Sequence, residues 1–218
     1  MKTLLASAAM AIALLHPQEP TVTSRAAGPI RWAEGAPNAT TEVKNDNKVE
    51  GLKTDEVQIY VSLAELKNTE YNRVWVQLFN HSQSPIDFDP QAAILLNGDK
   101  TVRAEVPEKA AHSIQKFAEA KSQELSSAHC TQMFHYECQP TAAQMQMSKE
   151  VLAESGKQVE WVRANAMAKS TVTPGNVAEG AIVFKKDKKK ADYILKVTVG
   201  SQLFEFPLSA QNEAPSYD

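Results

Sequence analysis

The stretch Val57-Gln-Ile-Tyr-Val-Ser-Leu63 alternates apolar with mostly polar residues, and Arg73-Val-Trp-Val-Gln-Leu-Phe79 repeats this alternation. Side chains along a β-strand point alternately to opposite faces, so each stretch places its aliphatic side chains on one face. These aliphatic residues are Val57, Ile59, Val61 and Leu63, then Val74, Val76 and Leu78. The sequence therefore predicts two amphipathic strands with a core against their aliphatic faces.

The second stretch carries a different set of side chains on its opposite face. Trp75 and Phe79 share that face with Arg73 and Gln77. An aromatic pair on a strand is either covered by another element or available to a partner. We expect a helical insertion to cover this pair. Trp161, on a predicted helix, is likewise either covered by another element or available to a partner.

Further strands are predicted around these two. Residues 93–96 and 101–106 flank Asn97-Gly98, and Asn-Gly is the dipeptide that a two-residue type I′ hairpin favours. The remaining strand segments are 86–88, 171–175, 180–184, 193–199 and 202–206, the last two joined at Gly200-Ser201.

Between these strands the period changes to that of a helix. Apolar residues recur every three or four positions from Pro107 to about Ser127, and a second such stretch runs from Thr141 to Lys169. Strands, two helices and more strands predict a mainly β fold, an antiparallel β-sandwich at residues 54–210 interrupted by a two-helix hairpin at 107–169. The closing hairpin must then pair with strands that precede the insertion.

Turn motifs in the β portion resemble a known class of domain. The segment Asn80-His-Ser-Gln-Ser-Pro-Ile-Asp-Phe88 and the later Val172-Thr-Pro-Gly175 with Gly180-Ala-Ile-Val-Phe184 resemble the immunoglobulin-like β-sandwich domains of unknown function in bacterial envelope and secreted proteins. The resemblance implies an immunoglobulin-like sandwich and a role in adhesion, assembly or binding. Fold-level analogy is an associational argument for such a role.

The first residues of the chain predict export, and two further segments near its ends are predicted to lack fixed structure. Met1-Lys-Thr3 and the apolar run 4–15 are typical of a signal peptide over residues 1–16, with cleavage as late as about residue 26. An uncleaved N-terminal anchor is the alternative. Residues 17–53 are predicted to be a flexible leader and 211–218 a disordered tail, because both are poor in apolar residues. We therefore expect a periplasmic or extracellular protein.

Composition excludes some classes of function. The 218 residues carry 23 Lys plus Arg against 26 Asp plus Glu, a formal net charge of −3. A nucleic-acid binder usually has a basic excess. With 43% hydrophobic and 22% charged residues and a mean hydropathy of −0.37, the chain has the composition of a globular protein, not of a multi-span membrane protein.

Two cysteines lie between the predicted helices. In an oxidising compartment Cys130 and Cys138 are expected to form a disulfide that ties the helix ends together. The alternative is an envelope metal-binding protein, because His129, Cys130, His135 and Cys138 are residue types that bind zinc.

A copper site is a variant of this alternative. Met133, Met145 and Met147 would add the thioether ligands that Cu(I) prefers. Met145 and Met147 are two positions apart and point in opposite directions on a helix, so both cannot face one ion. Packing is the commoner use of helical methionines.

A lysine-rich run separates two predicted strands. Lys185, Lys186, Lys188, Lys189 and Lys190 keep a hairpin tip solvated in the simplest interpretation. The alternative is contact with an anionic surface such as phospholipid, lipopolysaccharide or cell-wall polymer.

Catalytic signatures are missing from the sequence. Neither a G-x-S-x-G elbow nor an H-E-x-x-H helix occurs, and Asp87 and Asp89 lie between prolines in a predicted solvated bend. We therefore expect a non-enzymatic binding or structural protein of the bacterial cell envelope that needs no cofactor. Its partner would be another envelope protein or an envelope polymer, bound through the helical insertion. Membrane contact would be transient or through an uncleaved N-terminus.

Overall fold

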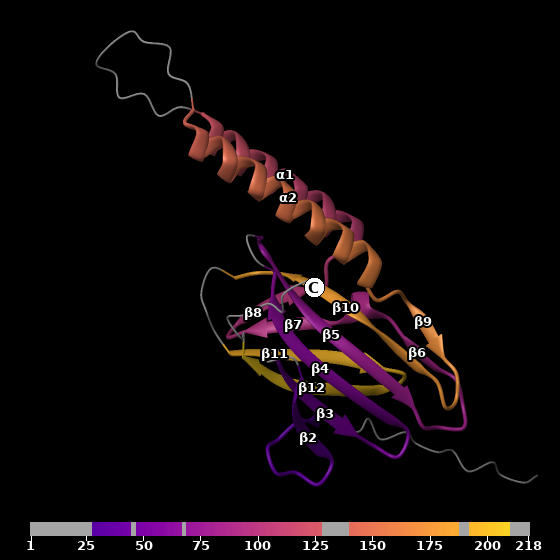
Figure 1. Cartoon of the computed structure of the whole chain (residues 1–218). Helices are drawn as coiled ribbons and strands as arrows, with labels where there is room; N and C mark the ends of the chain where they lie inside the picture. Colours follow the sequence, from indigo (N-terminus) through magenta and orange to yellow (C-terminus); the bar gives the residue numbers. More distant parts are fainter. Residues whose placement is uncertain (1–27, 45–46, 67–68, 128–139, 188–191, 210–218) are drawn as a thin grey trace, which may run out of the picture.

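Two β-sheets pack face to face, and a helical hairpin extends from one corner of this sandwich (Figure 1). The computed structural model describes residues 28–44, 47–66, 69–127, 140–187 and 192–209. Within these ranges the mainly β fold with an inserted helical hairpin is confirmed.

The larger sheet, sheet A, has seven strands in the described part of the chain and contains the closing hairpin. Its strands are β1 (Ile30–Arg31), β6 (Ile86–Phe88), β7 (Ile94–Asn97), β8 (Lys100–Arg103), β9 (Ser170–Val172), β11 (Asp192–Val199) and β12 (Gln202–Ser209). Strand β11 pairs with β12 and also with β6 and β7, which precede the insertion, as predicted. A 3₁₀ turn, η1 (Pro90–Ala92), lies between β6 and β7.

The smaller sheet, sheet B, contains the two strands whose alternation predicted the fold. Its order is β10-β5-β4-β3-β2. The strands are β2 (Ala39–Lys44), β3 (Asn47–Lys53), β4 (Val57–Glu65), β5 (Tyr71–Asn80) and β10 (Val177–Lys185). On β5 the aliphatic residues Val74, Val76 and Leu78 are fully buried and face sheet A, which confirms the predicted core.

The prediction of a flexible leader up to residue 53 is wrong for residues 30–31, which form β1 and pair with β12, and for residues 39–44 and 47–53. The last two segments form β2 and β3, with Leu52 opposite Ile59 of β4 and buried in the core. The sequence hides the alternation because Glu50 occupies an inward position of β3, where Lys48 pairs with its carboxylate at 2.6 Å.

The Asn-Gly hairpin forms with a different register from the one predicted. Asn97 pairs with Lys100 inside the ladder, so the two central residues are Gly98 and Asp99. Gly98 has a φ of 56°, which glycine adopts without steric cost. The Asn97 amide donates to the carboxylate of Asp187 at 3.2 Å, a tertiary contact that favours this register.

Helices α1 (Pro107–Ser126) and α2 (Ala142–Asn165) form the hairpin between β8 and β9. Small residues line their seam, where the hydroxyls of Ser122 and Ser148 lie 2.6 Å apart. Helix α2 ends at Asn165 and not at Lys169, because the Met167 amide donates to the carbonyl of Ala181 on β10. Strand pairing outcompetes the last helical turn there.

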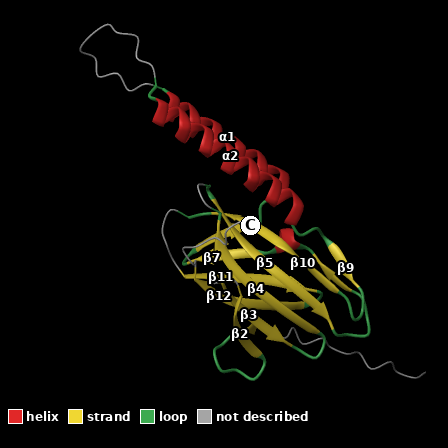
Figure 2. Cartoon of the chain, in the orientation of Figure 1, coloured by secondary structure: helices red, strands yellow, loops and turns green. Residues whose placement is uncertain are grey.

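Figure 2 shows that the two helices approach the strands at one end of the hairpin, its base. A second apolar cluster there joins both helices to the outer side of sheet B and to the β4–β5 connection. Its buried members are Leu66, Tyr71, Ala110, Ala111, Ile114, Val159, Val162 and Val183. The hairpin beyond this base extends away from the sandwich (Figure 1).

Candidate functional site

A groove of about 440 Å³ lies on the outer face of sheet B, beside the base of α2. Four strands and the last turns of α2 line it. The lining residues are Lys44, Asn47, Val49, Tyr60, Val61, Ser62, Ala64, Arg73, Trp75, Gln77, Trp161 and Asn165. Ligand sites of proteins typically have volumes of this order, so the groove is the candidate functional site.

Small side chains form the floor of the groove and Tyr60 forms one wall. Ser62 and Ala64 on β4 leave the space open, while the ring of Tyr60 lies over Gly51 of β3. A Cβ at Gly51 would come within 2.7 Å of that ring, so only glycine lets the ring lie against the sheet. The ammonium of Lys44 lies 5.7 Å from the Tyr60 ring centre, at the mouth of the groove.

The opposite wall brings together residues that are far apart in the sequence. Trp75 of β5 and Trp161 of α2 have ring centres 6.5 Å apart at an interplanar angle of 49°. The guanidinium of Arg73 stacks on the Trp161 ring at 4.4 Å, and Arg73 is only 7% exposed. Such a cation–π contact in a largely buried setting stabilises the wall by about 1–2 kcal/mol. The wall therefore joins an arginine and two tryptophans from sheet B and α2.

Aromatic and amide groups continue along the sheet beyond the groove. Phe79 packs edge-on against Tyr60 and stacks on His81, both at 6.2 Å between ring centres. The Gln58 amide donates to the Tyr60 hydroxyl at 2.6 Å and lies 3.2 Å from the His81 ring nitrogen. The outer face of β4 and β5 thus carries a row of rings with amides between them.

The described lining of the groove combines aromatic, amide, hydroxyl and basic side chains. Its charged residues are Lys44, which pairs with Glu42 at 3.0 Å, and Arg73. The arrangement can stack on a flat or ring-shaped ligand.

Behind the groove, one acidic group faces the interior. Glu50 on β3 is 2% exposed, and burial raises the pKa of its carboxyl, although the hydrogen bond from Lys48 and the charge of Lys48 oppose that rise. The same Lys48 lies 4.9 Å from the ring centre of Trp32. This cluster fixes β3 against the core and places Val49 on the groove side.

A second hollow, of about 790 Å³, lies among loops at the end of the sandwich. The loops around it are held by local contacts: the side-chain amide of Asn80, next to the hollow, donates to the carbonyls of Ser84 and Val172 at 2.8 and 2.7 Å. Asp87 accepts from the Thr171 hydroxyl, and Asp89 caps the turn η1. The two carboxylates thus act in local turns and pairing.

The predicted disulfide and metal ligands fall outside the described residues. These are His129, Cys130, Met133, His135 and Cys138. Met145 and Met147 lie on α2, 47% and 52% exposed. Across the ranges that the structure describes, no group of three His, Cys, Asp or Glu residues could hold a metal ion.

The lysine-rich run is described at its start. Lys185 pairs with Glu70 at 3.4 Å, and Lys186 pairs with Glu65 at 3.2 Å and donates to the Leu66 carbonyl. Lys188, Lys189 and Lys190 fall outside the described residues. The first two lysines therefore tie β10 to the β4–β5 connection.

The sequence predicted the β5 residues of the groove but not the residues on its other side. It placed Trp75 with Arg73 and Gln77 on one face, and the hairpin does reach Trp75 through Trp161. The expectation of full cover is wrong for Phe79, which packs on Tyr60 and His81 instead. The signal that was missed is Gly51, a strand glycine that marks the close approach of a side chain.

Comparison with models of protein families, with curated proteins and with solved structures gives no match to this chain. The resemblance to exported immunoglobulin-like domains stays a prediction. Among the described residues, no helix is long and apolar enough to cross a membrane. The ligand of the groove has therefore to be inferred from its residues and geometry.

Proposed function

We propose that this chain is an exported, non-catalytic binding protein of a bacterial cell envelope, and that its partner binds in the groove at the base of the helical hairpin. The N-terminal residues support export, since they are typical of a signal peptide. The groove supports binding.

One observation carries the proposal: Trp75, Trp161 and the buried Arg73 meet in a single wall that faces open space. Tryptophan and arginine are the residues most enriched at the energetic centres of binding sites. A fold that needed only to bury these rings would have closed the space beside them. Keeping the groove open between rigid elements suits a site that is ready for a ligand.

The helical insertion contributes directly to this site. Helix α2 supplies Trp161, which packs on the second apolar cluster, and Asn165, whose amide donates to the Trp161 carbonyl at 2.9 Å. Long insertions in compact domains often serve function. This arrangement supports the expectation that the partner binds through the insertion.

Photo-cross-linking from inside the groove tests the proposal. We would place p-benzoylphenylalanine at Ser62 on the groove floor and, as the matched control, at Thr198, an exposed hydroxyl residue on the outer side of β11. After irradiation with an envelope fraction, the Ser62 protein is expected to give a discrete adduct that the Thr198 protein does not give. Equal adducts from both positions, or none from Ser62, would contradict the proposal.

A further inference from the structure

We propose that the ligand of the groove is an uncharged oligosaccharide, and that one of its sugar rings enters the space beside Trp75. This inference rests on the proposed function and names the chemical class of its ligand. It is carried by three properties of the groove: its cations are held by neighbouring groups, its remaining polar groups both donate and accept hydrogen bonds, and its walls are aromatic.

The cations of the groove already have contacts within the protein. Lys44 pairs with Glu42 at 3.0 Å. The guanidinium of Arg73 stacks on the Trp161 ring at 4.4 Å and is only 7% exposed. A charged ligand would have to compete with these contacts and lose its own hydration in doing so. An uncharged ligand leaves them intact, so the charges of the groove favour a neutral molecule.

Three polar groups of the groove are left for a ligand by the described part of the chain. The indole N–H of Trp75 and the hydroxyl of Ser62 have no hydrogen-bond partner among the described residues, and both side chains are half-buried. Asn165 is half-buried too, and its amide nitrogen donates to the Trp161 carbonyl at 2.9 Å, which leaves its side-chain oxygen as an acceptor. Polar groups in such partly enclosed positions gain from a partner that the ligand supplies.

The chemistry of these three groups selects a ligand rich in hydroxyls. The indole can only donate, the amide oxygen can only accept, and the serine hydroxyl can do both. A sugar hydroxyl also does both, so the rim of a sugar ring can satisfy all three. A proline-rich peptide, another common ligand of aromatic grooves, has no N–H at its prolines and would leave the Asn165 oxygen without a donor.

The walls of the groove match the faces of a sugar. Trp75 lies directly opposite Ser62 in the pairing of β4 with β5, and Tyr60 is the next residue on the same face of β4. Side chains at opposite positions start about 5 Å apart, so the indole stands beside the space above Ser62. A pyranose ring has apolar C–H faces that pack on an aromatic ring and a rim of hydroxyls. The volume of about 440 Å³ exceeds that of one pyranose ring, so we expect a linked sugar to be contacted as well.

Calorimetric titration of the full chain with defined probes tests the ligand class. The uncharged probes are maltohexaose, cellohexaose and hexa-N-acetylchitohexaose, and the comparison probes are an alginate oligosaccharide, which is acidic, and an oligoproline peptide. We expect at least one uncharged probe to bind about tenfold or more tightly than both comparison probes. Its affinity should stay the same from about 0.05 M to about 0.5 M NaCl, since no ion pair is formed. Failure of all three uncharged probes, or equal binding of alginate or oligoproline, would overturn the inference.

Variants locate the site on the wall of the groove. Trp75→Ala should weaken binding of the uncharged probe about tenfold or more, and Trp75→Phe, which keeps a ring and loses the N–H, about threefold. Lys44→Gln should leave the affinity within about twofold, because the ligand carries no charge. The control is Ile194→Ala on sheet A, which removes an apolar side chain that is 42% exposed and should bind as the native chain does. Equal losses in Trp75→Ala and Ile194→Ala would contradict the assignment.

A blocking variant guards against loss of folding. Ser62→Trp adds bulk to the groove floor and removes no ring or charge, so it should abolish binding of the uncharged probe while thermal unfolding stays cooperative. Thr198→Trp adds the same bulk to an exposed position of β11 and should keep native affinity. Native affinity in Ser62→Trp would overturn the site.

The photo-cross-linking experiment separates this inference from the proposed function. If Ser62 cross-links to an envelope component and none of the uncharged probes binds, the oligosaccharide inference fails and the proposed binding function stands. If no uncharged probe binds and Ser62 does not cross-link, both fail.

Discussion

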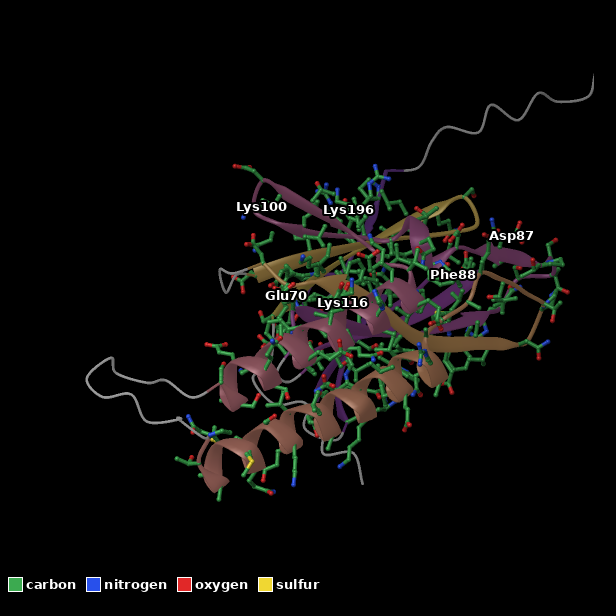
Figure 3. All side chains as sticks on the ribbon, turned by 90° about the horizontal axis from the view of Figure 1, so that it is seen from above. Glu70, Asp87, Phe88, Lys100, Lys116 and Lys196 are labelled. Carbon is green, nitrogen blue, oxygen red and sulfur yellow. The ribbon has the colours of Figure 1, made fainter. Side chains whose placement is uncertain are left out.

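The outer faces of the two sheets arise from the same alternation and carry opposite kinds of chemistry. On sheet A, Glu205 of β12 accepts from Arg31 at 2.7 Å and pairs with Lys196 of β11 at 2.8 Å, beside aliphatic side chains such as Ile194. On sheet B the corresponding positions hold aromatic rings, with a groove of about 440 Å³ beside them. Figure 3 shows Lys196 on the side of the molecule opposite the hairpin.

The two sheets also differ in the direction in which they shift the pKa of a carboxyl group. Hydrogen bonds from Lys196 and, to a lesser extent, from Arg31 lower the pKa of Glu205, although its burial opposes this. Behind the groove, burial raises the pKa of Glu50 despite the pairing with Lys48. Sheet A pairs Glu205 with two cations at the surface, whereas sheet B buries Glu50 behind the groove with Lys48 as its partner. The two carboxylates therefore respond to pH in opposite directions.

The largest change is expected where the groove face depends on one glycine. Gly51→Val places a Cβ against the Tyr60 ring and the Thr40 hydroxyl, so that ring must leave the sheet. We expect a loss of about 1–3 kcal/mol in the free energy of unfolding, although valine is the better strand former. Chemical denaturation of both proteins measures this change.

Gly156→Ala is the control for that glycine. Gly156 lies in α2 with no atom within 4 Å of a built Cβ, so alanine should raise the free energy of unfolding by about 0.5–1 kcal/mol. A Gly51→Val protein that is as stable as the native chain would show that Tyr60 does not need the sheet beneath it.

An intermediate effect is expected from acid titration of the two carboxylates. The folded pKa of Glu205 lies below the ordinary 4.5, so its stabilisation is complete above that value and is lost as the pH falls through the folded pKa. Glu205→Gln should cost about 1 kcal/mol at pH 7 and remove part of this acid sensitivity. Urea unfolding from pH 3 to pH 8 measures both.

Glu50 should give the opposite sign. Its folded pKa lies above 4.5, so native stability falls as the pH rises from 4.5 through the folded pKa. Glu50→Gln should flatten that fall. The contrast between the two faces would be contradicted if Glu50→Gln and Glu205→Gln altered the pH dependence of the free energy of unfolding in the same direction.

The smallest effect belongs to the apolar side chains of sheet A. Ile194→Ser changes a side chain that is 42% exposed and lies outside the buried core, so the free energy of unfolding should change by less than about 0.5 kcal/mol. Analytical ultracentrifugation of this variant and the native chain should give the same sedimentation coefficient. A sedimentation coefficient that differs between the variant and the native chain would show that sheet A, and not sheet B, is a surface on which copies of the chain associate.

Local patterns predicted the sandwich because its central strands obey them. The alternation of residues 57–63 and 73–79 fixes which side chains are buried, and the observed β4 and β5 follow it. Where a tertiary contact competes, the local signal fails. Asp187 favours a different hairpin register at Asn97, and pairing with Ala181 ends α2 at Asn165.

The groove could be predicted only in part. The face shared by Arg73, Trp75 and Gln77 follows from alternation alone. Its meeting with Trp161 depends on how the hairpin packs against the sheet, which no local pattern encodes. Strand β3 was missed because an inward acid, Glu50, is an exception to the rule that buried positions are apolar.

The two ends of the helical insertion return to one strand, and this bears on the order of folding. Ala104 before α1 bridges to Phe184, and Ala166 after α2 bridges to Ala181, both on β10. The entropy lost on closing a loop grows with its flexible length, and helix pairs form faster than strands that are distant in the sequence. Once α1 and α2 have paired, the long connection behaves as a short one. We therefore expect β10 to dock on β5 after the hairpin has formed, so that Trp75 and Trp161 meet in a late step of folding.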